Sequence, residues 1–374
     1  MGGVVGVDAN RPGVESESVR VRGVSDGKRA DVRVIGRSIS VLACAAVCCV
    51  VVACDERAEA GESARLDVRR VLGEPGRAPG QLMYPRGIAS ADGQLWVVDK
   101  AARVQRIDPE TGRGIRLFST PKFDNGKPTG ITLAPMPGDD ARLGLYVADT
   151  HEHRVIVYDV ESGSDEPALE FGSVGIEDGQ FTYPTDIAVL TDKAGRVERI
   201  YVSEYGGHDR ISAFSPEFEF LFDIGAFGVA HEGDNTEHRV VFDRPQSIAV
   251  DSVARELIVT DACNHRVGRF TLDGEHIAWI GGGTSDLLRY PYGLELIGNR
   301  QALIVEFGGN RVTRLDLDSG EVLEVIGEPG REPGQLASPW GVAAIGDELF
   351  VLDSGNNRIQ VVKLSGVPLA GGAR

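Results

Sequence analysis

The sequence contains six copies of a short strand motif anchored by a proline, and this repetition constrains the fold more than any other feature. The copies are YPRGIAS from Tyr84, KPTGITL from Lys127, YPTDIAV from Tyr183, RPQSIAV from Arg244, YPYGLEL from Tyr290 and SPWGVAA from Ser338. Their prolines lie 43 to 61 residues apart. A repeat of this length with several short strands is typical of a β-propeller, in which each repeat forms one blade.

A second motif follows each proline strand: an alternating apolar run, an acid, a turn rich in Gly, Asn and His, an arginine, and another alternating run. This pattern predicts a β-hairpin. The acids are Asp99, Asp149, Glu204, Asp261, Glu306 and Asp353, and the arginines are Arg103, Arg154, Arg210, Arg266, Arg311 and Arg358. We interpret each pair as a structural turn ion pair, because it recurs in every repeat and its carboxylate can also accept turn N–H groups.

The region from about residue 66 to 363 resembles the NHL-repeat family, whose name records an Asn-His-Leu turn. Asn264-His265 is the nearest match to that turn in this chain. The resemblance implies an all-β fold, a six-bladed β-propeller of four-stranded antiparallel blades. We assign residues 66–366 to the propeller.

The last repeat lacks a fourth strand of its own. The tail Ser365–Arg374 is too rich in glycine to supply one, and residues 367–374 are assigned as a tail. Val68–Gly73 aligns with Val322–Gly327, which is the fourth strand of the fifth repeat. We therefore expect the N-terminal strand to complete the last blade, which closes the ring and removes two exposed sheet edges.

Residues 1–54 are predicted to be a secretion signal. An uncharged run of 17 residues from Ser38 to Cys54 follows Arg33 and Arg37, and a basic flank before a short apolar run is typical of such signals. Val51-Val52-Ala53-Cys54 resembles the bacterial lipobox, in which cleavage before the cysteine leaves a lipid-bearing thiol. An uncleaved anchor helix and ordinary signal-peptidase cleavage stay open as alternatives.

The rest of the N-terminus follows from this assignment. Residues 1–33 are long and polar for a signal, and we interpret them as sequence upstream of a later true start. Residues 55–65 would tether the lipid to the ring. The signal predicts an exported protein that is anchored by its lipid in the bacterial cell envelope.

The charge balance limits the partners of the chain. Lys and Arg number 39 against 56 Asp and Glu, a formal charge of −17. Without residues 1–54 the charge becomes −19. Broad nucleic-acid binding needs a basic surface and is not expected. Outside the signal the only cysteine is Cys263, which excludes an intramolecular disulfide or a cysteine-based zinc site there. We expect Cys263 to be a small buried filler.

The residues directly after each proline are the candidate ligand-binding positions. In an up-and-down blade they should lie at the mouth of the central channel, on the face that also carries the hairpin turns. They differ from repeat to repeat, as expected for a binding surface on a repeated scaffold. The set is Arg86, Thr129, Thr185, Asp186, Gln246, Ser247, Tyr292 and Trp340.

This set has mixed polar and stacking character, which predicts a protein, peptide or small polar ligand bound by a monomeric propeller. Tyr292 and Trp340 could equally be packing residues. No catalytic constellation and no cofactor is evident in the sequence.

A metal-assisted lyase or hydrolase is the alternative function. The NHL family includes an amidating lyase whose zinc histidines follow the strand proline, and none of the six equivalent positions here is histidine. Lactonase-like propellers need several carboxylate or amide ligands in the channel, whereas Asp186 is the only acid among the mouth positions. His231 and His238, in the insertion at residues 228–239, are the weak candidates for zinc or calcium ligands.

The lipid assignment predicts that Cys54→Ser releases the protein from the membrane fraction, because the cleaved chain then has no other anchor. Fractionation and immunoblotting measure this. A variant that stays membrane-bound at precursor size would identify an uncleaved helix instead.

Overall fold

The computed structural model describes residues 65–122, 124, 127–230, 240–283 and 285–363. The predicted signal with Cys54, most of the tether, the candidate metal ligands His231 and His238, and the tail lie outside these residues. Among the described residues, no helix is long and apolar enough to cross a membrane.

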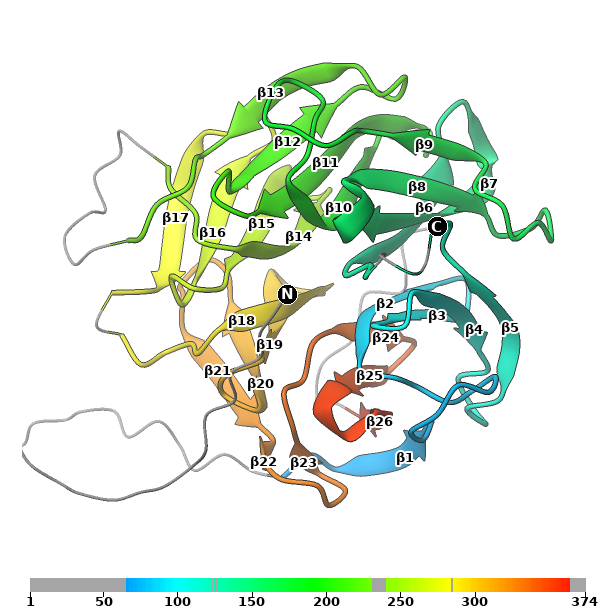
Figure 1. Cartoon of the computed structure of the whole chain (residues 1–374). Helices are drawn as coiled ribbons and strands as arrows, with labels where there is room; N and C mark the ends of the chain where they lie inside the picture. Colours follow the sequence, from blue (N-terminus) through cyan, green and yellow to red (C-terminus); the bar gives the residue numbers. More distant parts are fainter. Residues whose placement is uncertain (1–64, 123, 125–126, 231–239, 284, 364–374) are drawn as a thin grey trace, which may run out of the picture. The chain divides into compact units, whose positions relative to one another are not determined.

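Six four-stranded antiparallel sheets surround a central axis, which confirms the predicted six-bladed β-propeller (Figure 1). Blade 1 consists of β2 (Pro85–Ala91), β3 (Gln94–Asp99), β4 (Arg103–Ile107) and β5 (Gly114–Ser119). Blade 2 consists of β6 (Ile131–Met136), β7 (Asp139–Asp149), β8 (Arg154–Asp159) and β9 (Leu169–Phe171). Blade 3 consists of β10 (Tyr183–Thr191), β11 (Val197–Tyr205), β12 (Arg210–Phe214) and β13 (Phe220–Ile224).

The second half of the ring repeats this plan. Blade 4 consists of β14 (Pro245–Asp251), β15 (Glu256–Asp261), β16 (Arg266–Thr271) and β17 (His276–Gly281). Blade 5 consists of β18 (Pro291–Ile297), β19 (Gln301–Glu306), β20 (Arg311–Asp316) and β21 (Val322–Ile326). Blade 6 consists of β24 (Val342–Ile345), β25 (Glu348–Asp353), β26 (Arg358–Lys363) and β1 (Val68–Leu72).

Short elements join these strands, and we name the four strands of each blade a to d from the axis outward. The pair β22 (Glu328–Pro329) and β23 (Gln335–Leu336) lies in the loop that enters blade 6. Two 3-10 turns, η1 (Thr150–Glu152) and η2 (Ser354–Asn356), form part of b–c turns.

Ring closure by the N-terminal strand is confirmed. β1 pairs antiparallel with β26, with Val68 opposite Val362 and Leu72 opposite Ile359. Leu66 and Leu72 are both buried. The first described strand therefore covers the edge that blade 6 would otherwise expose.

The hydrophobic core lies between the blades. Six clusters of buried side chains each combine residues of two neighbouring sheets. Between blades 6 and 1, for example, Phe350 and Leu352 share a cluster with Val97 and Leu82. Each blade is therefore stabilised by both of its neighbours, as expected for a repeat that cannot bury its apolar faces alone.

An acid and an arginine pair across the b–c turn in every blade. Five of these six ion pairs have N–O distances of 2.6–3.1 Å, and the sixth joins Arg103 to Asp99. All six acids are fully buried. In five blades the carboxylate also accepts a backbone N–H from the d–a loop, as Asp353 does from Ala337 at 2.8 Å. The pair thus fixes the loop that leads into strand a.

A second contact joins the b–c turn of one blade to the start of strand a in the next. The residue before the proline has a left-handed backbone in four repeats, at Tyr84, Arg244, Tyr290 and Ser338. Its N–H is accepted by a turn side chain of the preceding blade. The acceptors are Asn357, Asp209, His265 and Asn310, at 2.6–3.0 Å. These Asn, Asp and His side chains of the b–c turns therefore hold an uncommon backbone conformation and connect neighbouring blades.

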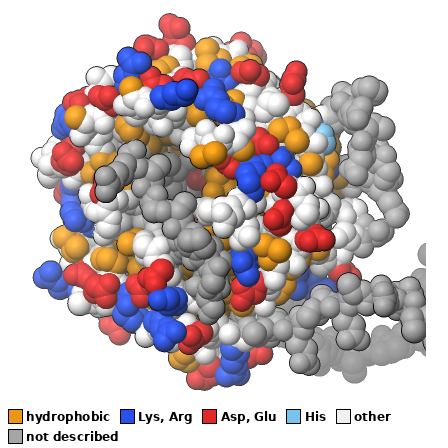
Figure 2. Space-filling model, turned by 180° about the vertical axis from the view of Figure 1, so that it is seen from behind, with side chains coloured by type: hydrophobic (Ala, Val, Ile, Leu, Met, Phe, Trp, Pro, Cys, Tyr) orange, Lys and Arg blue, Asp and Glu red, His pale blue; other side chains and the backbone are white. Residues whose placement is uncertain are grey.

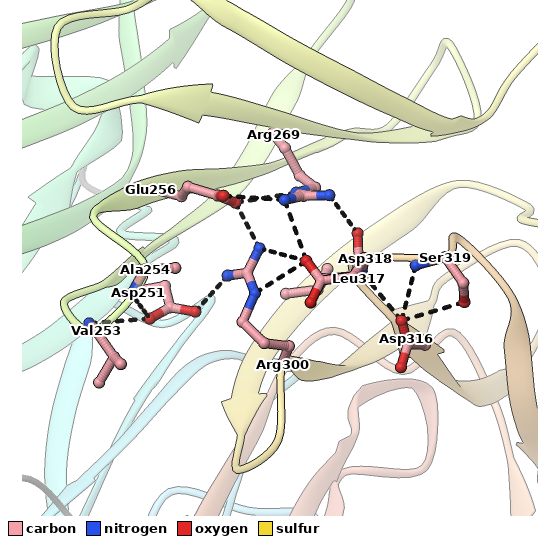
Figure 3. Close-up of polar contacts among 10 residues, drawn as sticks. All are labelled: Asp251, Val253, Ala254, Glu256, Arg269, Arg300, Asp316, Leu317, Asp318 and Ser319. Atoms are coloured by element: carbon pink, nitrogen blue, oxygen red, sulfur yellow. Dashed lines mark hydrogen bonds and ion pairs between the residues drawn. The ribbon is translucent and has the colours of Figure 1, made fainter.

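The face that carries the a–b and c–d turns has a dense ion-pair network between blades 4 and 5 (Figure 3). Arg300 contacts Asp251 at 2.6 Å, Glu256 at 2.8 Å and Asp318 at 3.0 Å, and Arg269 contacts the same Glu256 and Asp318. On the part of the surface that is visible in Figure 2, acidic and basic side chains are interspersed.

Deleting Leu66–Leu72 should destabilise the propeller far more than deleting residues 366–374. The two buried leucines alone contribute about 3–6 kcal/mol, which corresponds to a melting temperature lower by roughly 6–20 °C. Thermal denaturation of the two truncated chains tests this. Equal melting temperatures would show that β1 does not contribute to closure.

Candidate functional site

All eight predicted mouth residues line one cavity of about 270 Å³ on the propeller axis. Its walls come from the first strand of every blade. The structure therefore brings these eight residues together. Their roles as ligand contacts remain a prediction, which their individual environments refine.

A β-bulge directs the residue after the proline in four blades. The strand register shifts between Pro85 and Gly87, and likewise after Pro184, Pro245 and Pro291. The extra residue is left out of the ladder, which re-aims its side chain. The glycine that follows in blade 2 is also required, because a Cβ on Gly130 would lie 2.4 Å from the Thr185 carbonyl oxygen of blade 3.

The polar groups of four of the eight residues form hydrogen bonds between neighbouring blades. Thr129 donates its hydroxyl to the Thr185 carbonyl at 2.8 Å, and Thr185 donates to the Pro245 carbonyl at 2.7 Å. Ser247 donates its hydroxyl to Asp186 at 2.5 Å. These side chains therefore join the inner strands and are less available to a ligand than the sequence suggested.

The two aromatic mouth residues pack against each other. Trp340 is 8% exposed and Tyr292 is 7% exposed. Their ring centroids lie 5.0 Å apart, and Phe307 stacks on Tyr292 at 4.6 Å. The two rings therefore pack against each other, and both also border the cavity.

Among the eight mouth residues, Arg86 carries a positive charge that takes little part in contacts stabilising the fold. Its guanidinium lies over the Trp340 ring at 5.1 Å and donates to the Lys127 carbonyl at 3.3 Å. Among the described residues no carboxylate pairs with it. Burial, together with the nearby Arg244, lowers the pKa of Arg86, so its charge lacks compensation.

Two functional candidates were missed by the sequence reasoning. Arg244 precedes the proline, and only its neighbour Gln246 was selected, yet its Nε donates to Gln246 at 2.9 Å. Glu295 lies three residues after Tyr292 on β18 and lines the same cavity. Asp186 is therefore not the only channel acid. Inspection of alternate positions along each inner strand would have found Glu295.

Both channel acids have raised pKa values because burial disfavours their charged forms. Burial raises the pKa of Asp186 to about 7, although Ser247 and the Ile248 N–H stabilise its charge. Burial raises the pKa of Glu295 to about 8, against a hydrogen bond from the Ala344 N–H. Near neutral pH, both groups can hold or release a proton.

Histidine and cysteine contribute little to this cavity. His153 and His265 lie in b–c turns, as predicted. Cys263 is partly exposed in the blade 4 turn, so the expectation of a buried filler was wrong. Within the ranges that the structure describes, no three His, Cys, Asp or Glu side chains are grouped as metal ligands. The His231 and His238 candidates lie outside those ranges and stay a prediction.

Residues 242–270 and 336–362 match the NHL repeat family model. Protein brain tumor of Drosophila melanogaster is 26% identical over 159 residues, which is 42% of this chain and 14% of the fly protein. The chain thus spans a small part of that curated relative.

Two solved structures show the same fold. A protein of unknown function from Bacteroides thetaiotaomicron has a TM-score of 0.56 and 17% identity, covering 80% of this chain and 74% of that one. Kuenenia stuttgartiensis hydrazine synthase has a TM-score of 0.50 and 14% identity, covering 78% and 98%. The chain therefore carries NHL repeats within a six-bladed β-propeller.

Asp186→Asn should change the pH dependence of stability. The folded pKa of about 7 exceeds the ordinary value of 3.8, so the folded state binds the proton more tightly. The unfolding free energy of wild type minus that of the variant should fall by roughly 2–4 kcal/mol as the pH rises from about 4 to 7. Urea denaturation over this range measures it.

Asp108→Asn is the matched control. Hydrogen bonds from Thr111 and Glu110 lower the pKa of Asp108, so the corresponding difference should change in the opposite direction, falling as the pH drops below about 4. If the difference in unfolding free energy between wild type and variant changed with pH in the same direction for Asp186→Asn and for Asp108→Asn, the raised pKa of Asp186 would be contradicted.

Proposed function

We propose that this chain is a binding scaffold of the bacterial cell envelope, exported and held by a lipid, which binds a protein, peptide or small polar ligand at the channel mouth. The convergence of the non-repeating residues on one cavity carries this proposal. In a structure of unknown function, a well-formed cavity with a few convergent polar groups is the first candidate for the binding site.

The repeated residues support the proposal by contrast. The turn acids and arginines are paired with each other, and the turn Asn and His side chains hold the next blade. Folding accounts for these positions in full. It does not account for Arg86 and Gln246, which differ from their counterparts in other blades and border the cavity.

The size of the cavity limits what enters it. At about 270 Å³, it lies just below the range of ~300–1,000 Å³ typical of ligand pockets. A small ligand, or one side chain or terminus of a larger partner, would fit. The remaining contacts of a protein partner would then lie on the surrounding b–c turns and d–a loops.

A metal-assisted lyase or hydrolase is the second candidate, and the raised pKa values of Asp186 and Glu295 favour it. Asp186, however, is bonded to Ser247 and to the Ile248 N–H of the next blade. A structural contact explains its burial, so we rank the enzyme below the scaffold.

The mouth face can be tested by photo-crosslinking in cells. A benzoylphenylalanine at Lys100, in the b–c turn of blade 1 and with its ammonium over Tyr84, should capture a partner that the same group at Lys193, on the opposite face, does not. Arg86→Ala should weaken the binding of the purified partner by ~1–3 kcal/mol, the usual range for an interface anchor. Calorimetry measures this change.

Asp139→Ala with Lys193→Ala is the control, since both residues are exposed on the face opposite to the mouth. Trp340→Ala is a poorer test, because the buried ring also supports its neighbours. Binding that is lost in the control pair and retained in Arg86→Ala would show that the opposite face is the binding surface.

A further inference from the structure

Two arginines lie close together near the channel mouth: Arg86 lines the cavity, and Arg244 lies beside it, with the two guanidinium groups against the contacting rings of Trp340 and Tyr292. On the opposite face, Arg300 alone contacts three carboxylates (Figure 3). No described carboxylate pairs with Arg86 or Arg244, although acids outnumber basic residues by 17. Unlike the charge of Arg300, the charges of these two arginines are not offset by a direct ion pair.

Aromatic rings hold both guanidinium groups in place. Arg86 lies 5.1 Å from the centroid of Trp340, and Arg244 lies 5.3 Å from that of Tyr292 and 4.5 Å from that of Tyr205. Trp340 and Tyr292 are themselves in contact. The two cations therefore lie on neighbouring parts of one aromatic surface, with their geometry fixed before any ligand arrives.

Most of the N–H groups of these arginines remain available. A guanidinium has five donors. Arg86 donates to the Lys127 carbonyl, and its buried Nε has no partner. Arg244 donates its Nε to Gln246. A buried donor without an acceptor costs free energy that a bound acceptor would recover.

The surroundings favour an acceptor with a single negative charge. A carboxylate matches the planar fork of arginine. A dianion or a polyanion would meet stronger repulsion from a chain whose acids outnumber its basic residues by 17. The adjoining rings of Trp340 and Tyr292 would accommodate an aromatic or apolar group next to the carboxylate.

We propose that Arg86 and Arg244 form a binding site for one carboxylate attached to an aromatic or apolar group, on a small organic acid or at the C-terminus of a peptide. This inference rests on the proposed binding function of the mouth and specifies its ligand class. It concerns Arg244 as well as the positions selected from the sequence.

Calorimetry with two probes that differ only in charge tests the site. The full chain, purified in detergent, is titrated with N-acetylphenylalanine and with its amide. We expect the acid to bind at least ten times more tightly than the amide. Arg86→Gln and Arg244→Gln should each lower the affinity for the acid about tenfold or more and leave the amide unchanged.

Arg113→Gln is the matched control. Arg113 is exposed in the c–d turn of blade 1, where its charge acts on Asp108, so its loss removes the same charge from the opposite face. It should leave both probes unaffected. Arg86→Lys retains the charge without the fork and should keep part of the preference for the acid. Thermal denaturation confirms that each variant is folded.

A hexapeptide that ends in phenylalanine, with a free or an amidated C-terminus, separates the two ligand sources. Tighter binding of the free peptide than of N-acetylphenylalanine indicates a chain terminus, and the reverse indicates a small acid. Either result supports the inference.

Equal affinities for acid and amide, or no binding of any of these probes, would overturn the inference. A partner crosslinked from Lys100 would still support the proposed function in that case. Failure of the carboxylate site can therefore be distinguished from failure of the proposed binding function.

Discussion

The buried acid–arginine pair across each b–c turn is the interaction on which this propeller depends. An isolated buried carboxylate is costly, and the cost is offset only if the charge is paired and its lone pairs are satisfied. Here the arginine pairs with the acid, and the d–a loop donates backbone N–H groups to it, as between Asp353, Arg358 and Ala337. The loop that begins strand a therefore cannot move without exposing a buried charge.

This arrangement separates residues that serve the fold from those that can serve a ligand. Five loops are held by the same contact, so the residues after the prolines occupy equivalent places and can vary independently. Part of this freedom is nevertheless used by the ring. Thr129 and Thr185 bond the next inner strand, and Asp186 bonds blade 4. Fewer of these residues are therefore available to a ligand than their variation between repeats suggests.

The fold was predictable because its signals are local. Alternation, the proline motif and the turn pair all lie within one repeat, and the closing strand resembles the strand it replaces. The site was less predictable because its chemistry depends on contacts between repeats. Whether a threonine faces the cavity or donates to the next blade depends on partners that lie 56 and 60 residues away in the sequence. Glu295 and Arg244 were missed because attention was restricted to the positions directly after each proline.

The net charge of the molecule would give the proposed carboxylate site a selectivity that its two arginines alone would not have. At long range, a net charge of −17 repels any anion, and the repulsion grows with the charge of the ligand. At short range, Arg86 and Arg244 would attract an anion, and because the site is partly buried, salt and water screen this attraction less. At the proposed site, a ligand with one carboxylate would meet a smaller electrostatic barrier than a polyanion and would still match the fork of an arginine. In this proposal the acidic exterior and the two arginines together favour small or singly charged ligands.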